Sequence, residues 1–146
     1  MTEQKLQDYQ VAGVNRISIG LQSTNNDLLQ QIGRIHTFEQ FLKTYELVEK
    51  VGFENKNVDL MIGLPNQTLQ DIENAIQQVI ELKPTHISVY SLIVEEGTVL
   101  QQKIDRGELT LPLEEIERAM YWKVKELLEK AGYIHYEISN FAISRL

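Results

Sequence analysis

The chain has 146 residues, of which 42% are hydrophobic, and these values favour one globular domain over residues 1–146. A net charge of −7 without a long basic run argues against nucleic acid as a partner. The absence of cysteine excludes a disulfide, a thiol nucleophile and a thiolate-held metal cluster within the chain.

Strand-like and helix-like segments alternate along the sequence. The first predicted strand, residues 16–21, alternates between two faces. Ile17, Ile19 and Leu21 lie on one face, and Ser18, Gly20 and Gln22 lie on the other. The segments that follow are a helix near 27–32, a helix that starts after Thr37 and ends at Gly52, the strand NVDLMIGLP at 57–65, a helix that Thr68 caps, a strand at 86–95, helices near 98–105 and 114–131, and a last strand at 133–139.

This alternation predicts right-handed crossovers and a sheet of parallel strands. Two α/β folds are compatible with it: an open doubly wound sheet and part of a (β/α) barrel. In either fold, we expect the functional residues where the strands end and the loops begin.

Asp59 is the residue that most indicates a function. It alternates with Val58, Leu60 and Ile62, so it points to the other face of its strand, as Gln22 does on the preceding strand. Parallel sheets are normally apolar on both faces, so a polar inner face suggests a ligand. The alternative for Asp59 is a structural carboxylate that is hydrogen-bonded to its neighbours.

Other chemistry finds little support in the sequence. His36, His86 and His135 are far apart and lack the close spacing of a helical metal pair, so we predict no metal ligands. The serines lack the context of a hydrolase nucleophile, and GLPNQT lacks the glycine spacing and the lysine of a phosphate loop. We therefore predict no catalytic residue within this chain.

A membrane location is not expected either. The apolar runs are too short to span a bilayer, and the first ten residues lack the basic and then apolar pattern of a secretory signal. We expect a cytoplasmic protein with no membrane-spanning segment.

Five segments, taken together and in this order, closely resemble one family. They are NRISIGLQS, IGRIHT, VDLMIGLPNQT, HISVYSLIVEEGT and GYIHYEISNFA. The family comprises the proteins similar to oxygen-independent coproporphyrinogen III oxidase, which are radical S-adenosylmethionine (SAM) proteins. The resemblance extends from Gly13 to Ala142, and GRIH and YEISNFA are more similar to its haem-chaperone branch than to its true oxidases.

The resemblance implies the later strands of a partial (β/α) barrel and part of a SAM site. The positions that match the family's SAM lining are Gln22, Arg34, Asp59 and Ile93. We expect Arg34 to bind the methionine carboxylate of SAM, because its guanidinium can pair with a carboxylate through two hydrogen bonds. Gln22 and Asp59 would then hydrogen-bond to other polar groups of SAM.

The family also binds a [4Fe–4S] cluster through three cysteines near its N-terminus, and this chain has no cysteine. The first strands of the barrel are not apparent, and the final NFAISRL departs from the family pattern. We therefore expect this chain to be a fragment of an oxidoreductase of porphyrin or haem metabolism. By itself, the fragment should have no radical activity. Two alternatives stay open: a haem-binding or haem-transfer chaperone without oxidase activity, and a non-catalytic structural fragment.

The resemblance also bears on partners. The parent protein would handle a porphyrin or haem, although nothing in the sequence marks an axial ligand among its histidines and tyrosines. A half-barrel leaves sheet edges that invite pairing, so we expect a homodimer.

Overall fold

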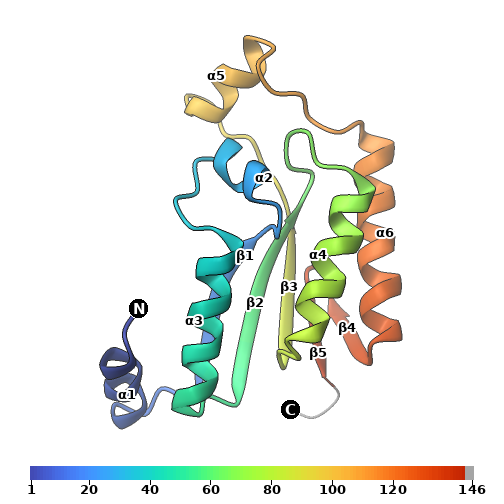
Figure 1. Ribbon diagram of the computed structural model, residues 1–146. Coiled ribbons are helices and arrows are strands. Elements are labelled where there is room, and N and C mark those ends of the chain that lie inside the picture. The colour runs from blue at the N-terminus through green and yellow to red at the C-terminus, as the bar shows by residue number, and fades with distance from the viewer. Residues whose placement is uncertain (144–146) are drawn as a thin grey trace.

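The computed structural model describes residues 1–143, so Ser144–Leu146, at the end of the divergent NFAISRL segment, lie outside the described residues (Figure 1). Its centre is one five-stranded sheet with the strand order β1-β2-β3-β5-β4. The first three strands are parallel, and β5 and β4 complete the sheet in antiparallel orientation. The strands are β1 (Arg16–Gln22), β2 (Asn55–Ile62), β3 (His86–Ser91), β4 (Tyr133–Glu137) and β5 (Asn140–Ile143).

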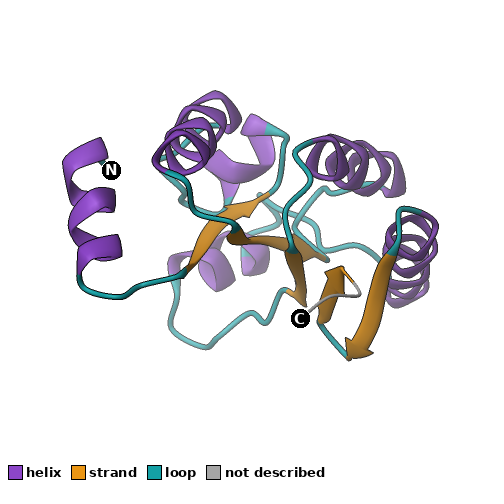
Figure 2. Ribbon diagram, turned by 90° about the horizontal axis from the view of Figure 1, so that it is seen from below, coloured by secondary structure: helices purple, strands orange, loops and turns teal. Residues whose placement is uncertain are grey.

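Three long helices, α3, α4 and α6, cover one side of the curved sheet (Figure 2). Their apolar stripes pack on the side chains of β2 and β3, including Val58, Leu60 and Ile87, to form the main core. The helices within residues 1–143 are α1 (Glu3–Val11), α2 (Asn26–Gln31), α3 (Phe38–Val51), α4 (Leu69–Glu81), α5 (Val99–Asp105) and α6 (Glu114–Lys130). Helices packed on a single face fit the barrel alternative, since a doubly wound sheet needs helices on both faces.

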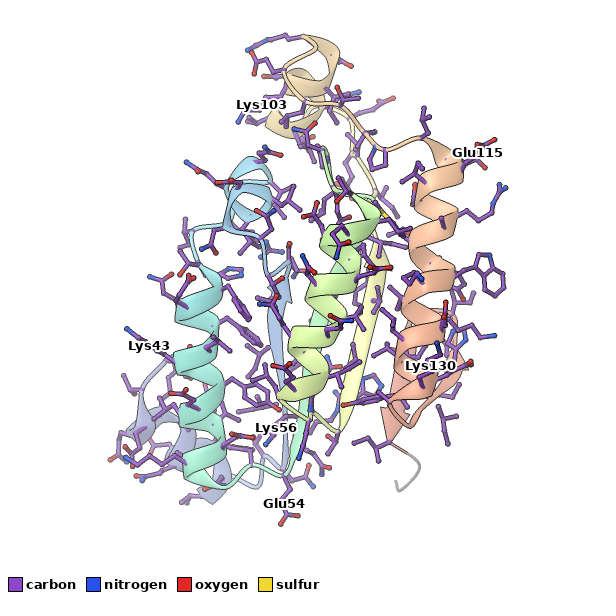
Figure 3. The ribbon with its side chains drawn as sticks, turned by 45° about the vertical axis from the view of Figure 1, so that its right-hand side comes forward. Lys43, Glu54, Lys56, Lys103, Glu115 and Lys130 are labelled. Atoms are coloured by element: carbon purple, nitrogen blue, oxygen red, sulfur yellow. The ribbon has the colours of Figure 1, made fainter. Side chains whose placement is uncertain are left out.

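Local signals explain where the helices begin. Thr37 caps α3 in a capping box with Gln40, as the sequence predicts. Thr68 caps α4 in a second capping box, with Asp71. Helix α6 has Glu115 near its N-terminus and Lys130 in its last turn (Figure 3), charges that complement the helix dipole.

A tight turn follows β2 and leads toward α4. Gly63 has a φ of 76°, and a Cβ atom there would lie 3.1 Å from Glu117 Cδ of α6, so glycine is needed for both the turn and the packing. The buried Gln67 side chain holds the turn: it accepts from Leu64 N at 3.0 Å and donates to Met61 O at 3.1 Å. The segment GLPNQT is therefore a turn, as predicted.

The structure differs from the sequence predictions in three elements. Helix α1 was not predicted; Leu6 anchors it in a second, smaller cluster with Val48 and Phe53. Strand β3 ends at Ser91 and not at Glu95, because its neighbour β2 ends opposite it, at Ile62. The last predicted strand, 133–139, ends at Glu137 as β4, and a strand that was not predicted, β5, follows it and forms an antiparallel hairpin with β4.

The side of the sheet opposite α3, α4 and α6 is called the open face here. Cross-strand register places Ser18, Asn57 and His86 in one row across it, and Gly20, Asp59 and Ser88 in the next. The row toward the carboxyl ends pairs Met61 with Tyr90. This face is polar, as the alternation in β1 and β2 predicts. Across residues 1–143, no helix combines the length and apolarity needed to cross a membrane.

Candidate functional site

Gln22 and Asp59 come together at the end of the open face. Gly20 pairs with Asp59 across the two strands, and Gln22 lies just beyond, at the last position of β1. A Cβ atom on Gly20 would lie 3.2 Å from Gln22 Nε2, so the Gln22 side chain lies directly over this glycine. The polar end of Gln22 is thereby held beside the strand position of Asp59.

A bulge in β1 produces this arrangement. The register with β2 shifts between Gly20 and Gln22, and Gln22 has a φ of 72°. Positive φ values are uncommon for residues other than glycine, and they concentrate at functional sites. The bulge turns the buried Gln22 side chain onto the open face, and it occurs where the SAM lining was predicted.

The Asp59 carboxylate is held on one side and open on the other. Asn57 Nδ2 donates to its Oδ1 at 2.7 Å, whereas among the described residues Oδ2 receives only a 3.4 Å contact from Ser18 Oγ. The residue is half-buried, so its carboxylate retains contact with solvent. Asp59 Oδ2 therefore keeps acceptor capacity for a ligand that lies on the open face.

Asp59 belongs to a polar layer on the open face, and most of this layer was missed by the sequence reasoning. We define the polar layer as Ser18, Asn57, Asp59, His86 and Ser88. The buried Asn57 is its centre: Nδ2 donates to Ser18 Oγ at 2.7 Å, and Oδ1 lies 2.6 Å from His86 Nδ1 and 3.1 Å from Ser88 Oγ. The signal that could have found Asn57 is its position two residues before Asp59, on the same face of β2.

Arg34 belongs to the loop after α2, and Ile93 belongs to the loop after β3. Both loops lie toward the end of the sheet where the parallel strands finish (Figure 1). Both side chains are exposed, Ile93 by 79%. Arg34 lines an open hollow of about 310 Å³ together with His36, whose Nε2 lies 3.0 Å from the Leu21 carbonyl and so tethers this loop to β1. In the described part of the chain, Arg34 forms no hydrogen bond or ion pair with Gln22 or Asp59.

A model of the family described as the Radical SAM superfamily matches residues 1–79, which include α1 to α3, most of α4 and both strands that carry Gln22 and Asp59. The chain belongs to the radical SAM superfamily. This finding confirms the family predicted from the sequence motifs.

Two curated relatives bear the same name. The chain is 44% identical over 142 residues to the heme chaperone HemW of Bacillus subtilis, covering 97% of this chain and 38% of that protein. It is 44% identical over 132 residues to heme chaperone HemW of Lactococcus lactis, covering 90% of this chain and 35% of that protein. These relatives agree with the predicted haem-chaperone branch.

The fold has a solved counterpart in coproporphyrinogen III oxidase (HemN) from Escherichia coli, a radical SAM enzyme. The TM-score is 0.86 at 25% identity, and the match covers 97% of this chain and 32% of that one. The predicted fold class, part of a (β/α) barrel, is thus confirmed. The chain spans between about a third and two fifths of these relatives' length.

Proposed function

We propose that the chain forms one side of a SAM site in a radical SAM protein of the haem-chaperone type. The observation that carries the proposal is the bulge that sets Gln22 over Gly20, next to Asp59. In this arrangement a side-chain amide and a carboxylate oxygen with spare acceptor capacity face the same space.

The roles of the four residues follow from their chemistry. Asp59 and Gln22 would hydrogen-bond to the polar groups of SAM, and Arg34 would pair with its carboxylate through two N–H donors. The loop that carries Arg34 is anchored to β1 by His36, and the Arg34 side chain is exposed. Ile93 would supply apolar contact from the loop after β3.

A [4Fe–4S] cluster accompanies SAM in full-length members of the superfamily, and its ligands are thiolates. The chain has no cysteine, and within residues 1–143 no group of three His, Asp or Glu side chains could hold a metal. The residues present therefore fit SAM and do not fit the cluster. We derive no chemical step through the cluster for this chain, whose contribution is to bind and orient SAM.

Haem is the second ligand that we propose, as cargo. Its support is the 44% identity to two heme chaperones, over nearly the whole of this chain. The alternative is a purely structural role, in which titrations of SAM and of haem into the chain would show no binding of either.

Calorimetric titration of SAM into the chain tests the SAM site. Asp59→Asn keeps the size of the side chain and removes its charge, and we expect SAM to bind about tenfold or more weakly, since a hydrogen bond to a charged group contributes about 1.5–3 kcal/mol. Asp8→Asn on α1 is the matched control, because it removes the same charge from an exposed helix outside the open face. Equal affinities for the two variants would remove Asp59 from the site.

A further inference from the structure

Asn57 uses both ends of its side-chain amide, at the centre of the polar layer. The residue is 2% exposed. Its Nδ2 donates one hydrogen to Asp59 Oδ1 and the other to Ser18 Oγ, both at 2.7 Å. Its Oδ1 lies 2.6 Å from His86 Nδ1. An amide that is engaged on three sides in this way has one orientation, so Asn57 is a rigid group within the sheet.

The orientation of this amide follows from the charge of Asp59. A carboxylate only accepts hydrogen bonds, so the NH₂ end of Asn57 must face Asp59 and its oxygen must face His86. Turned the other way, the amide would place two oxygens 2.7 Å apart with no hydrogen between them. His86 Nδ1 therefore carries a hydrogen, which it donates to Asn57 Oδ1.

Ser88 does not replace His86 as this donor. Its hydroxyl has one hydrogen and lies between two amide oxygens, Asn57 Oδ1 at 3.1 Å and Asn140 Oδ1 at 2.8 Å. Asn140 Nδ2 donates to the Glu137 carboxylate, so the Asn140 oxygen faces Ser88. The shorter contact takes the Ser88 hydrogen, which leaves His86 Nδ1–H as the donor that holds Asn57 Oδ1.

His86 is itself held in place by Tyr136 of β4. The histidine is 7% exposed, and its Nε2 lies 2.6 Å from Tyr136 Oη. The two rings meet edge to face with centroids 5.7 Å apart. Tyr136 is the extra residue of a bulge, since the register of β4 with β5 shifts between His135 and Glu137. Both ring nitrogens of His86 are thus engaged, and a flip of the ring would break both contacts.

The Asp59 carboxylate needs this support because its own torsion is soft. The last torsion of an aspartate side chain has broad minima, so an unsupported carboxylate turns easily. Asp59 is half-buried, and Gly20, its partner on β1, has no side chain to hold it. Among the described residues, Asn57 makes the one short hydrogen bond to this carboxylate. That bond fixes Oδ1 and leaves Oδ2 as the oxygen available to a ligand.

We propose that Asn57 is a positioning residue of the SAM site, which fixes the Asp59 carboxylate for its ligand, and that His86 keeps the Asn57 amide in the required orientation; this inference rests on the SAM-binding part of the proposed function. Neither Asn57 nor His86 contacts SAM directly. A ligand binds more weakly when a side chain of its site must be ordered on binding. The polar layer orders the Asp59 side chain before SAM binds.

Calorimetric titration of SAM tests the role of Asn57 through a double-mutant cycle with Asp59→Ala. Asn57→Ala should weaken SAM binding by about threefold to tenfold, because the freed Asp59 side chain is then ordered only on binding. In the Asp59→Ala chain, the same change at Asn57 should weaken binding no further, since no carboxylate remains to be oriented. Asn55→Ala is the matched control: Asn55 lies on the same face of β2, is exposed, and should leave the affinity for SAM unchanged.

His86→Asn and His86→Gln form a second, matched pair of variants that leaves Asn57 in place. In His86→Asn the new amide nitrogen can take the position of Nδ1 and donate to Asn57, whereas in His86→Gln the longer side chain reaches the position of Nε2. We expect His86→Asn to bind SAM within about twofold of the unmodified chain and His86→Gln to bind it about threefold or more weakly. Equal affinities for the two variants would overturn the role of His86.

The outcomes separate the inference from the proposed function. Circular dichroism and urea midpoints establish that each variant is folded, and the His86 pair tests the amide orientation even if Asn57→Ala unfolds. Losses that multiply in the double variant would show a general effect on the sheet and overturn the inference. Weak binding by Asp59→Ala together with normal binding by Asn57→Ala would overturn the inference while the SAM site stands. No binding of SAM by the folded, unmodified chain would overturn both.

Discussion

Replacing Asn57 by alanine should destabilise the fold strongly, because this residue joins the strands of the open face. Its amide is buried and contacts four other side chains. They are Ser18, Asp59, His86 and Ser88. Within residues 1–143, no buried side-chain nitrogen or oxygen lacks a hydrogen-bond partner, so the native layer is fully satisfied.

The size of the effect follows from what each partner loses. His86 Nδ1–H would lose its acceptor in a buried position, at about 1–3 kcal/mol, and Asp59 would lose a hydrogen bond to a charged group, worth about 1.5–3 kcal/mol. Solvent can replace part of the second bond, since Asp59 is half-exposed. Ser18 is exposed and Ser88 keeps its 2.8 Å bond to Asn140, so both lose little. The expected loss in unfolding free energy is about 2–4 kcal/mol.

Urea unfolding followed by circular dichroism measures this loss. With a slope of about 2 kcal/mol per molar urea, the midpoint should fall by about 1–2 M at an unchanged slope. Asn55→Ala is the matched control: the same residue type at an exposed position of the same strand, expected to change stability by less than about 0.5 kcal/mol. Midpoints for the two variants that agree within error would refute the reasoning that the polar layer stabilises the fold.

Two further predictions concern a helix cap and pH. Thr68→Ala removes the capping box that Thr68 forms with Asp71, so the free energy of unfolding should fall by about 1 kcal/mol and the Tm by about 2–4 °C. Thr110→Ala alters an exposed loop threonine and is the control. An equal fall in Tm for the two variants would contradict the role of the cap. Because burial lowers the pKa of His86, the unfolded chain takes up this proton first as the pH falls below about 6.5, so the native state should lose stability from there down to the lower folded pKa. Urea midpoints between pH 7.5 and 5 should fall less steeply for His86→Gln, and parallel curves would show that His86 is not the responsible group.

Much of the fold could be predicted because its signals are local. The capping residues Thr37 and Thr68, the helical spacing of apolar residues and the two-residue alternation of the strands each act over one or two turns of chain. The same alternation correctly predicted a polar inner face with Asp59 on it. The predicted SAM roles of Gln22, Arg34, Asp59 and Ile93 remain predictions, as do the single-domain organisation and the homodimer.

Other features depend on partners distant in the sequence and were missed for that reason. The end of β3 depends on where β2 stops, and the hairpin of β4 and β5 depends on pairing with β3. Periodicity within one segment contains no information about either. Helix α1 has only one fully buried side chain, Leu6, so its apolar pattern is too weak to stand out.

The sequence by itself determined which residue types face the interior, where the helices start and to which superfamily the chain belongs. The tertiary structure alone decided how the polar residues connect: the bulge that turns Gln22 over Gly20, the Asn57 amide between Asp59 and His86, and the bulge that brings Tyr136 to His86. The physical reason is that a hydrogen bond requires agreement in position within a fraction of an ångström. Strand register sets that agreement, and register is a property of the whole sheet and not of any one strand.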